Sequence, residues 1–259
     1  MAKGSKIWNA DNLPADSAFK FQVTDAADIL KEASENFVHH QAEAWRQVRR
    51  WADDQMEIVE VQEGGSPNGP GASLALTEHL RTELPKLLRR YAITSLLDVA
   101  CGDLNWMRHV DLSMIANYFG WDIDEELIIR AQTRAAEMVG HPHTWFEVRN
   151  VAETSFPNVD CILARHILIH FPNDYITAIL DRIRDGHATY LLASNFPDAT
   201  NDFVYDPTRY AWMGYMERPV NLELPPFNLK PAVAAITEQS GPAGVLTENH
   251  ELALYRLHA

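Results

Sequence analysis

Cysteine is scarce in this sequence, and its scarcity excludes one class of protein. Only two of the 259 residues are cysteines, Cys101 and Cys161, and both lie in apolar segments typical of strands. Two cysteines so far apart do not provide the disulfide framework of a small secreted domain. We therefore expect buried, reduced thiols and a cytoplasmic protein.

Long apolar runs are also absent. No segment of about 18 uncharged apolar residues occurs, and residues 1–6 carry positive charge with no apolar stretch behind them. We expect neither a membrane-spanning helix nor a signal peptide, and no membrane partner.

Basic residues are few relative to acidic ones. The chain has 22 Lys and Arg against 36 Asp and Glu, which gives a net charge of −14 at pH 7. Without a dense basic stripe to follow a phosphate backbone, nucleic acid is not expected as a partner. A hydrophobic content of 46% is nevertheless enough to fill a large core.

Alternating apolar and amphipathic segments predict an α/β fold with a Rossmann-like, doubly wound and mostly parallel sheet. We expect residues 1–62 to form a helical N-terminal extension, either a lid or a dimerisation element, and residues 63–259 to form the main domain. The expected strands are 95–99, 118–122, 143–148, 159–164 and 190–194, and the expected helices are 77–90, 106–109, 125–138, 173–184 and 230–239. A final antiparallel hairpin, 245–247 with 252–257, is expected at the edge of the sheet.

The most informative segment is residues 95–106. Leu96, Leu97 and Val99 predict a buried parallel strand, which ends in a turn of small residues that includes Gly102. A dinucleotide fingerprint needs three glycines, and the third is missing here. The loop therefore favours an adenosine ligand with a short zwitterionic tail over a nicotinamide dinucleotide.

The next expected strand ends at Asp122, 24 positions after Asp98. An acidic residue about 20 positions beyond the first turn of such a sheet accepts hydrogen bonds from ribose hydroxyls. Alternatively, Asp122 only caps the helix that begins near Glu125.

Together these motifs resemble the class I S-adenosylmethionine-dependent methyltransferases, in particular a bacterial small-molecule subgroup, over roughly residues 65–236. The matching positions are Gly69–Ser73, Thr77, Leu80–Arg81, Leu96–Met107, Asp122, Ile167–His170 and Asn221–Asn228. The resemblance implies S-adenosylmethionine as the cofactor. It says much less about which acceptor is modified.

The same resemblance implies the residues that bind the cofactor. Asp98, Ala100 and Gly102 are expected beside its methionine part, and Asp122 at the ribose. Asn150 is expected at the adenine amine and Val151 against the adenine ring, and Ile123 and Arg165 are further residues expected around the cofactor. Family members usually carry Asp where this chain has Asn150, which otherwise suits an ordinary turn.

Histidines follow the expected strand 159–164. The subgroup often has Arg then Asp there, whereas this chain has Arg165 then His166, and His170 follows four residues later. A histidine of ordinary pKa suits proton removal near neutrality, so His166 and His170 are candidate catalytic residues. Alternatively, both only hydrogen-bond the backbone. We expect no metal, because no third ligand is nearby in sequence.

An aromatic segment over residues 203–216 contains Tyr210 and Trp212. Aromatic faces attract cations such as a sulfonium, so Tyr210 is a third candidate catalytic residue; alternatively, these rings only pack the loop.

Three functions remain open from the sequence. The first is N- or O-methylation of a small molecule. The second is cyclisation of the cofactor to azetidine-2-carboxylate with release of methylthioadenosine, as in the azetidine-2-carboxylate synthases, which resemble methyltransferases. The third is a non-catalytic cofactor-binding module. A homodimer is compatible with each.

Overall fold

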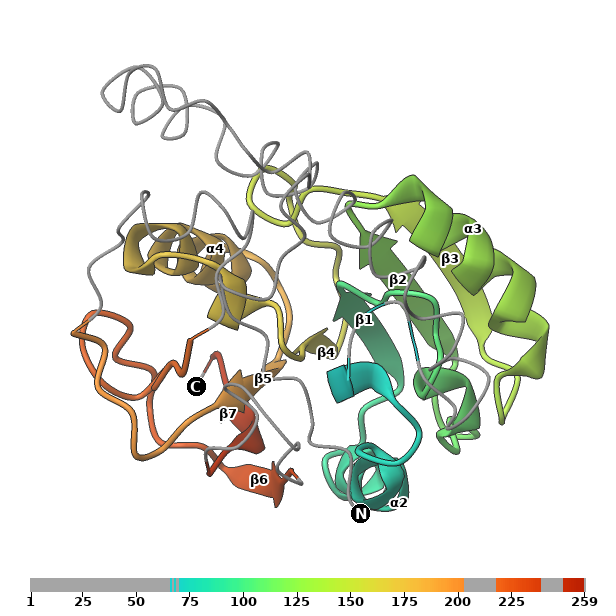
Figure 1. The fold of residues 1–259 in the computed structure, drawn as a ribbon, viewed down its shortest axis with the longest axis horizontal. Helices are drawn as coiled ribbons and strands as arrows, with labels where there is room; N and C mark the ends of the chain where they lie inside the picture. Colours follow the sequence, from blue (N-terminus) through green and yellow to red (C-terminus); the bar gives the residue numbers. More distant parts are fainter. Residues whose placement is uncertain (1–65, 67, 69, 203–217, 239–248, 259) are drawn as a thin grey trace, which may run out of the picture.

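A seven-stranded sheet organises the chain (Figure 1). The computed structural model describes Ser66, Asn68 and residues 70–202, 218–238 and 249–258. The strands are β1 (Ser95–Val99), β2 (Asn117–Asp122), β3 (His143–Val148), β4 (Cys161–Ala164), β5 (Tyr190–Asn195), β6 (Ala234–Thr237) and β7 (Glu251–Arg256). Their order is β3-β2-β1-β4-β5-β7-β6. Strands β1 to β5 are parallel, and β7 is antiparallel to both of its neighbours.

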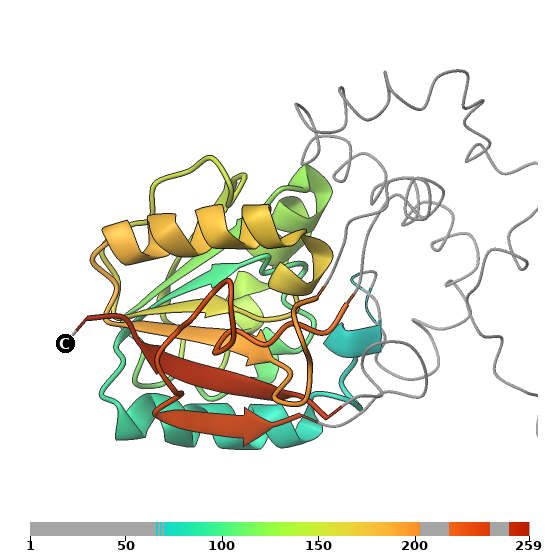
Figure 2. The same ribbon diagram turned by 90° about the vertical axis from the view of Figure 1, so that its left-hand side faces the viewer.

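Helices cover the sheet on both faces, and Figure 2 shows α4 and α2 on opposite sides of it. The α-helices are α2 (Glu78–Arg90), α3 (Glu125–Arg134) and α4 (Asn173–Asp185). Short 3-10 turns are η2 (Pro70–Ala72), η3 (Met107–His109), η4 (Ala135–Glu137) and η5 (Leu168–His170). The predicted doubly wound α/β fold is confirmed.

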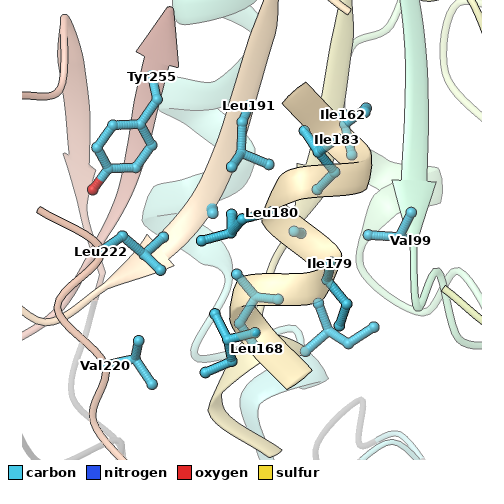
Figure 3. Packing of buried hydrophobic residues seen from close by; sticks show 14 of the residues in the cluster. Val99, Ile162, Leu168, Ile179, Leu180, Ile183, Leu191, Val220, Leu222 and Tyr255 are labelled. Carbon is cyan, nitrogen blue, oxygen red and sulfur yellow. The ribbon is translucent and has the colours of Figure 1, made fainter. Parts of the chain in front are cut away.

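The core has two halves because neighbouring side chains of a strand point to opposite faces. On β1, Leu97 joins the cluster under α4, whereas Leu96 joins the cluster shared by α2 and α3. Figure 3 shows the first half, where Ile179 and Ile183 of α4 lie against the sheet. Burying each such side chain contributes about 1.5–3 kcal/mol, so this packing fixes α4 on the sheet.

The expected helix at 230–239 is wrong, because residues 234–237 form strand β6. The alanine-rich segment has a local preference for helix, but Ala235 pairs with Ala253 and Ile236 with Leu252 of β7. Ile236 is buried while its neighbours Ala235 and Thr237 are exposed, which is the period of a strand. Pairing with a distant segment has outweighed the local propensity.

The expected terminal hairpin also needs correction. β7 lies between β5 and β6 rather than at the edge, and its hairpin partner is β6. Residues 245–247 lie outside the described residues, as does the expected N-terminal extension 1–62. Helix α3 ends at Arg134, four residues earlier than expected, and continues as the turn η4.

Both cysteines are free and buried, as predicted. Among the described residues, no helix combines the length and apolar character that crossing a membrane requires.

Candidate active site at the carboxyl edge of the sheet

The loop after β1 has an unusual backbone. Ala100, Gly102 and Leu104 all have left-handed φ angles, of 66°, 59° and 59°. At Gly102, a Cβ atom would also lie 2.2 Å from the side-chain nitrogen of Asn68. The left-handed conformation favours glycine at this position, although Ala100 and Leu104 also adopt it, and the close approach of Asn68 leaves no room for a Cβ atom unless that side chain moves.

Asp122, at the end of β2, holds this loop. Its Oδ2 accepts a hydrogen bond from the backbone N–H of Gly102 at 3.0 Å, and its Oδ1 accepts one from the N–H of Asp124 at 3.0 Å. The cap of α3 is Asp124, which accepts hydrogen bonds from the N–H groups of Glu126 and Leu127. The alternative that Asp122 caps this helix is therefore wrong.

Two buried carboxyl groups lie at this corner of the sheet. Burial raises the pKa of Asp98 to about 7, although a hydrogen bond from the Tyr118 hydroxyl at 2.7 Å opposes the shift. Burial likewise raises the pKa of Asp122 to about 6, against the backbone N–H groups of Asp124 and Gly102. With pKa values near neutrality, both groups would be shifted toward the ionised form by a cationic ligand.

Asp103 links the loop after β1 to neighbouring segments, a role that the sequence analysis did not predict. Its buried carboxylate forms an ion pair with Arg134 of α3 and accepts hydrogen bonds from Ser66 Oγ at 3.2 Å and Asn68 Nδ2 at 2.9 Å. Ser66 and Asn68 therefore lie directly against the loop after β1.

The end of β4 carries a second group of polar residues. The Arg165 guanidinium donates two hydrogen bonds to Oε2 of Glu238, from Nε at 2.9 Å and from Nη2 at 2.6 Å, and lies 5.2 Å from the centre of the Trp106 ring. Both partners of this ion pair are buried. Trp106 closes the motif 95–106, so Arg165 connects the two ends of the site.

His166 has a left-handed backbone, with φ of 54°, and its N–H donates to Ser194 Oγ at 2.9 Å. Burial lowers the pKa of its side chain well below the ordinary value, and the positive charge of Arg165 adds to the shift. His166 is therefore a neutral imidazole at physiological pH. Its Nε2 lies 3.9 Å from Oε1 of Glu238.

Part of the chain matches a known protein family. A family model described as a methyltransferase domain matches residues 96–187, from β1 to just beyond α4. The matched segment is less than half of the chain. This match agrees with the predicted methyltransferase family, for which S-adenosylmethionine is the predicted cofactor.

Solved structures of methyltransferases share the fold. One is N-methyltransferase NodS from Bradyrhizobium japonicum WM9 in complex with S-adenosyl-L-homocysteine, with a TM-score of 0.51, 16% identity and coverage of 70% of this chain and 87% of that one. Another is magnesium protoporphyrin IX methyltransferase (ChlM) from Synechocystis PCC 6803 with bound S-adenosylhomocysteine, with a TM-score of 0.55, 12% identity and coverage of 84% and 99%. No curated protein matches the sequence.

The residues of the methyltransferase domain fit this cofactor. Ala100 is exposed at the top of the left-handed loop, and the Asp122 carboxylate lies beside it at the end of the neighbouring strand. Asn150 Oδ1 accepts a hydrogen bond from the N–H of Ala152 at 3.0 Å, whereas its buried Nδ2 has no hydrogen-bond partner among the described residues. An unpaired buried donor is the kind of group that a ligand nitrogen satisfies.

The other predicted residues divide into three groups. Ile123 and Val151 lie at the margin of the core cluster under α4, at the same edge of the sheet as Asp122. His170 ends η5 close enough for its charge to lower the pKa of His166. Tyr210 lies outside the described residues.

Two polar residues near His166 were missed by the sequence reasoning. Glu238 directly follows β6 and His250 directly precedes β7, so they are 72 and 84 positions away from His166. No local pattern marks either one. They reach the site only because β6 and β7 extend the sheet beyond β5.

Proposed function

We propose that this protein transfers the methyl group of S-adenosylmethionine to a nitrogen or oxygen atom of a small molecule. The observation that carries the proposal is the hydrogen bond from the Gly102 N–H to Asp122, which joins the loop after β1 to the carboxylate at the end of β2. Ligands of open α/β sheets bind at this edge, outside the carboxyl ends of the strands.

Each part of the cofactor has a proposed partner. Asp98, with Ala100 and Gly102, is proposed at the methionine part, where an ionised carboxylate favours the ammonium group. Asp122 is proposed at the ribose, and Ile123 and Val151 at the adenine ring. Asn150 donates from Nδ2, so in this chain its expected partner is a ring nitrogen, which accepts, rather than the adenine amine.

Arg165 is proposed to support this site indirectly, through its contacts with other protein residues. Because its guanidinium donates two hydrogen bonds to Glu238, its proposed contribution is to hold the end of β4 against Trp106.

S-adenosylmethionine, when bound, supplies a methyl group on a positively charged sulfur. The protein then has to position the acceptor in line with that group and remove a proton from it. His166 and His170 are the proposed catalytic residues for this second task, with Tyr210 as a further proposal. A neutral imidazole such as that of His166 has a lone pair available for a proton or for an ion.

The proposal of a small acceptor rests on two supports. The solved methyltransferases described above include an enzyme named for a porphyrin, magnesium protoporphyrin IX. The net charge of −14 opposes binding of a polyanion such as nucleic acid.

The decisive experiment identifies the nucleoside by-product. The full chain is incubated with S-adenosylmethionine, with and without a protein-free metabolite extract, and the products are separated by chromatography and mass spectrometry. Methyl transfer predicts S-adenosylhomocysteine that depends on the extract, together with a methylated product.

Two variants make the result specific. Asp122→Asn is expected to abolish turnover, whereas Asp185→Asn, at the exposed end of α4, is expected to retain it. Methylthioadenosine formed from the cofactor alone would instead establish cyclisation. Tight cofactor binding with neither by-product would establish a non-catalytic module.

A further inference from the structure

Three potential metal ligands from three separate segments meet at the carboxyl edge of the sheet. They are His166 after β4, Glu238 after β6 and His250 before β7, and one ligand atom of each lies within 4.8 Å of those of the other two. β6 runs parallel to β4, and β7 runs opposite to both, so all three residues emerge at the same edge. The backbone hydrogen bond from Glu238 N–H to His250 O, at 3.1 Å, fixes two of them side by side.

Two of the ligand atoms have no hydrogen-bond partner among the residues that the structure describes. Glu238 has a side chain that is 2% exposed, and its Oε1 is among the buried polar atoms without a partner in the described part of the chain. Nε2 of His166 is a second buried polar atom without a partner among the described residues. The 3.9 Å between these two atoms is too long for a hydrogen bond. Because buried polar groups are almost always paired, both atoms point to a ligand that joins them.

Arg165 determines which oxygen of Glu238 is available. Its guanidinium occupies Oε2 with two hydrogen bonds, so the carboxylate is held with Oε1 turned toward His166. Partners that orient a ligand in this way commonly surround metal ions in proteins. The ring of Phe196 stacks on His250, with centroids 5.2 Å apart, and so fixes the third ligand.

We propose that His166, Glu238 and His250 bind one divalent transition metal ion. Two imidazoles and a carboxylate are the donor set of catalytic zinc sites and of non-haem iron sites, and they leave coordination positions open. The three ligand atoms now lie within 4.8 Å of one another. Metal–ligand bonds of about 2.0–2.2 Å would require these atoms to lie closer together when the ion is bound.

This proposal differs from the expectation of no metal, which rested on the lack of a third ligand nearby in sequence; Glu238 and His250 are distant in sequence and close in space. When the ion is bound, Nε2 of His166 is a ligand, and His170 is left as the histidine proposed to accept the proton. The ion would lie at the edge where the proposed function puts the acceptor. The metal site does not depend on that function, because its binding is measured without cofactor or acceptor.

The test is isothermal titration calorimetry. The full chain is first treated with a chelator to remove bound metal and is then titrated with ZnCl₂. One ion per chain is expected. His250→Gln and Glu238→Gln should each weaken binding by roughly 100-fold or more, since even the outer partners of metal ligands account for about 10- to 100-fold. The control is His187→Gln, which changes an exposed histidine outside the cluster and should leave the affinity unchanged.

A second measurement needs no variant. CoCl₂ added to the stripped wild-type protein should give visible absorption bands without the intense near-ultraviolet band of a cobalt–thiolate bond. A thiolate band would place the ion on Cys101 or Cys161 and overturn the proposal. So would the absence of stoichiometric binding, or an unchanged affinity in a folded His250→Gln protein.

Discussion

The backbone N–H of Gly102 donates a hydrogen bond of 3.0 Å to the carboxylate of Asp122, 20 positions later in the chain. This single contact joins the ends of two parallel strands, β1 and β2, at the site of the methyltransferase domain. It also holds Gly102 in a left-handed conformation in contact with Asn68. The shape of the loop therefore depends on both residues.

Gly102→Ala should destabilise the protein by about 1–2 kcal/mol, because an L-residue with a left-handed backbone carries that cost. The affinity for S-adenosylmethionine should fall as well, and both are measurable, by urea unfolding and by calorimetry. In the double variant Asn68→Ala/Gly102→Ala the close contact at 2.2 Å is removed but the backbone strain is not. A partial recovery is expected; full recovery would show that the contact alone requires glycine.

Binding of S-adenosylmethionine should strengthen as the pH rises from 5 to 8. Burial raises the pKa of Asp98 to about 7 and that of Asp122 to about 6, so both carboxyl groups become ionised across this range and attract the positively charged ligand. Calorimetric titrations at several pH values measure the effect. Asp98→Asn should remove the step near pH 7 and keep the step near pH 6. A profile identical to that of the wild type would contradict the proposed place of Asp98.

The stability of the ligand-free protein should change in the opposite direction. A carboxyl group with a raised folded-state pKa stabilises the protein fully below its unfolded value, near 4, and this contribution is lost as the pH rises through about 6 and 7. The free energy of unfolding of wild type relative to Asp98→Asn should therefore decrease between pH 4 and pH 7.5. A constant difference across that range would be incompatible with a buried, raised Asp98.

Arg165→Met should destabilise the protein by about 3–5 kcal/mol, because it leaves the buried Glu238 carboxylate without its cation. The double variant Arg165→Met/Glu238→Gln should recover much of this loss. Urea unfolding of both single variants and the double variant gives the coupling free energy. Strictly additive effects would mean that the pair does not act as a unit.

Ile183→Ala, in the core under α4, should cost about 2–5 kcal/mol, because it removes a fully buried side chain and leaves a cavity. Ile129→Ala on α3 is the matched control, since its side chain is 55% exposed and the change should stay within about 0.5 kcal/mol. Thermal unfolding of the two variants compares them directly. Equal effects would contradict the packing in Figure 3.

The local sequence determined the parts of this protein whose signals are short-range. Strands β1 and β3 begin and end where expected, because apolar and β-branched residues between turn signals specify them without help from distant segments. The small-residue turn after β1 and the acidic residue at the end of β2 likewise indicated the methyltransferase family, with which the match over residues 96–187 agrees.

Only the tertiary structure decided which distant residues complete the site. Residues 234–237 became a strand because β7 was available to pair with them, and this pairing carries Glu238 and His250 to His166. The same is true of Tyr118 beside Asp98 and of Asn68 beside Gly102. These contacts arise from strand order and register, which depend on the free energy of the whole packed sheet and leave no pattern within one stretch of the chain.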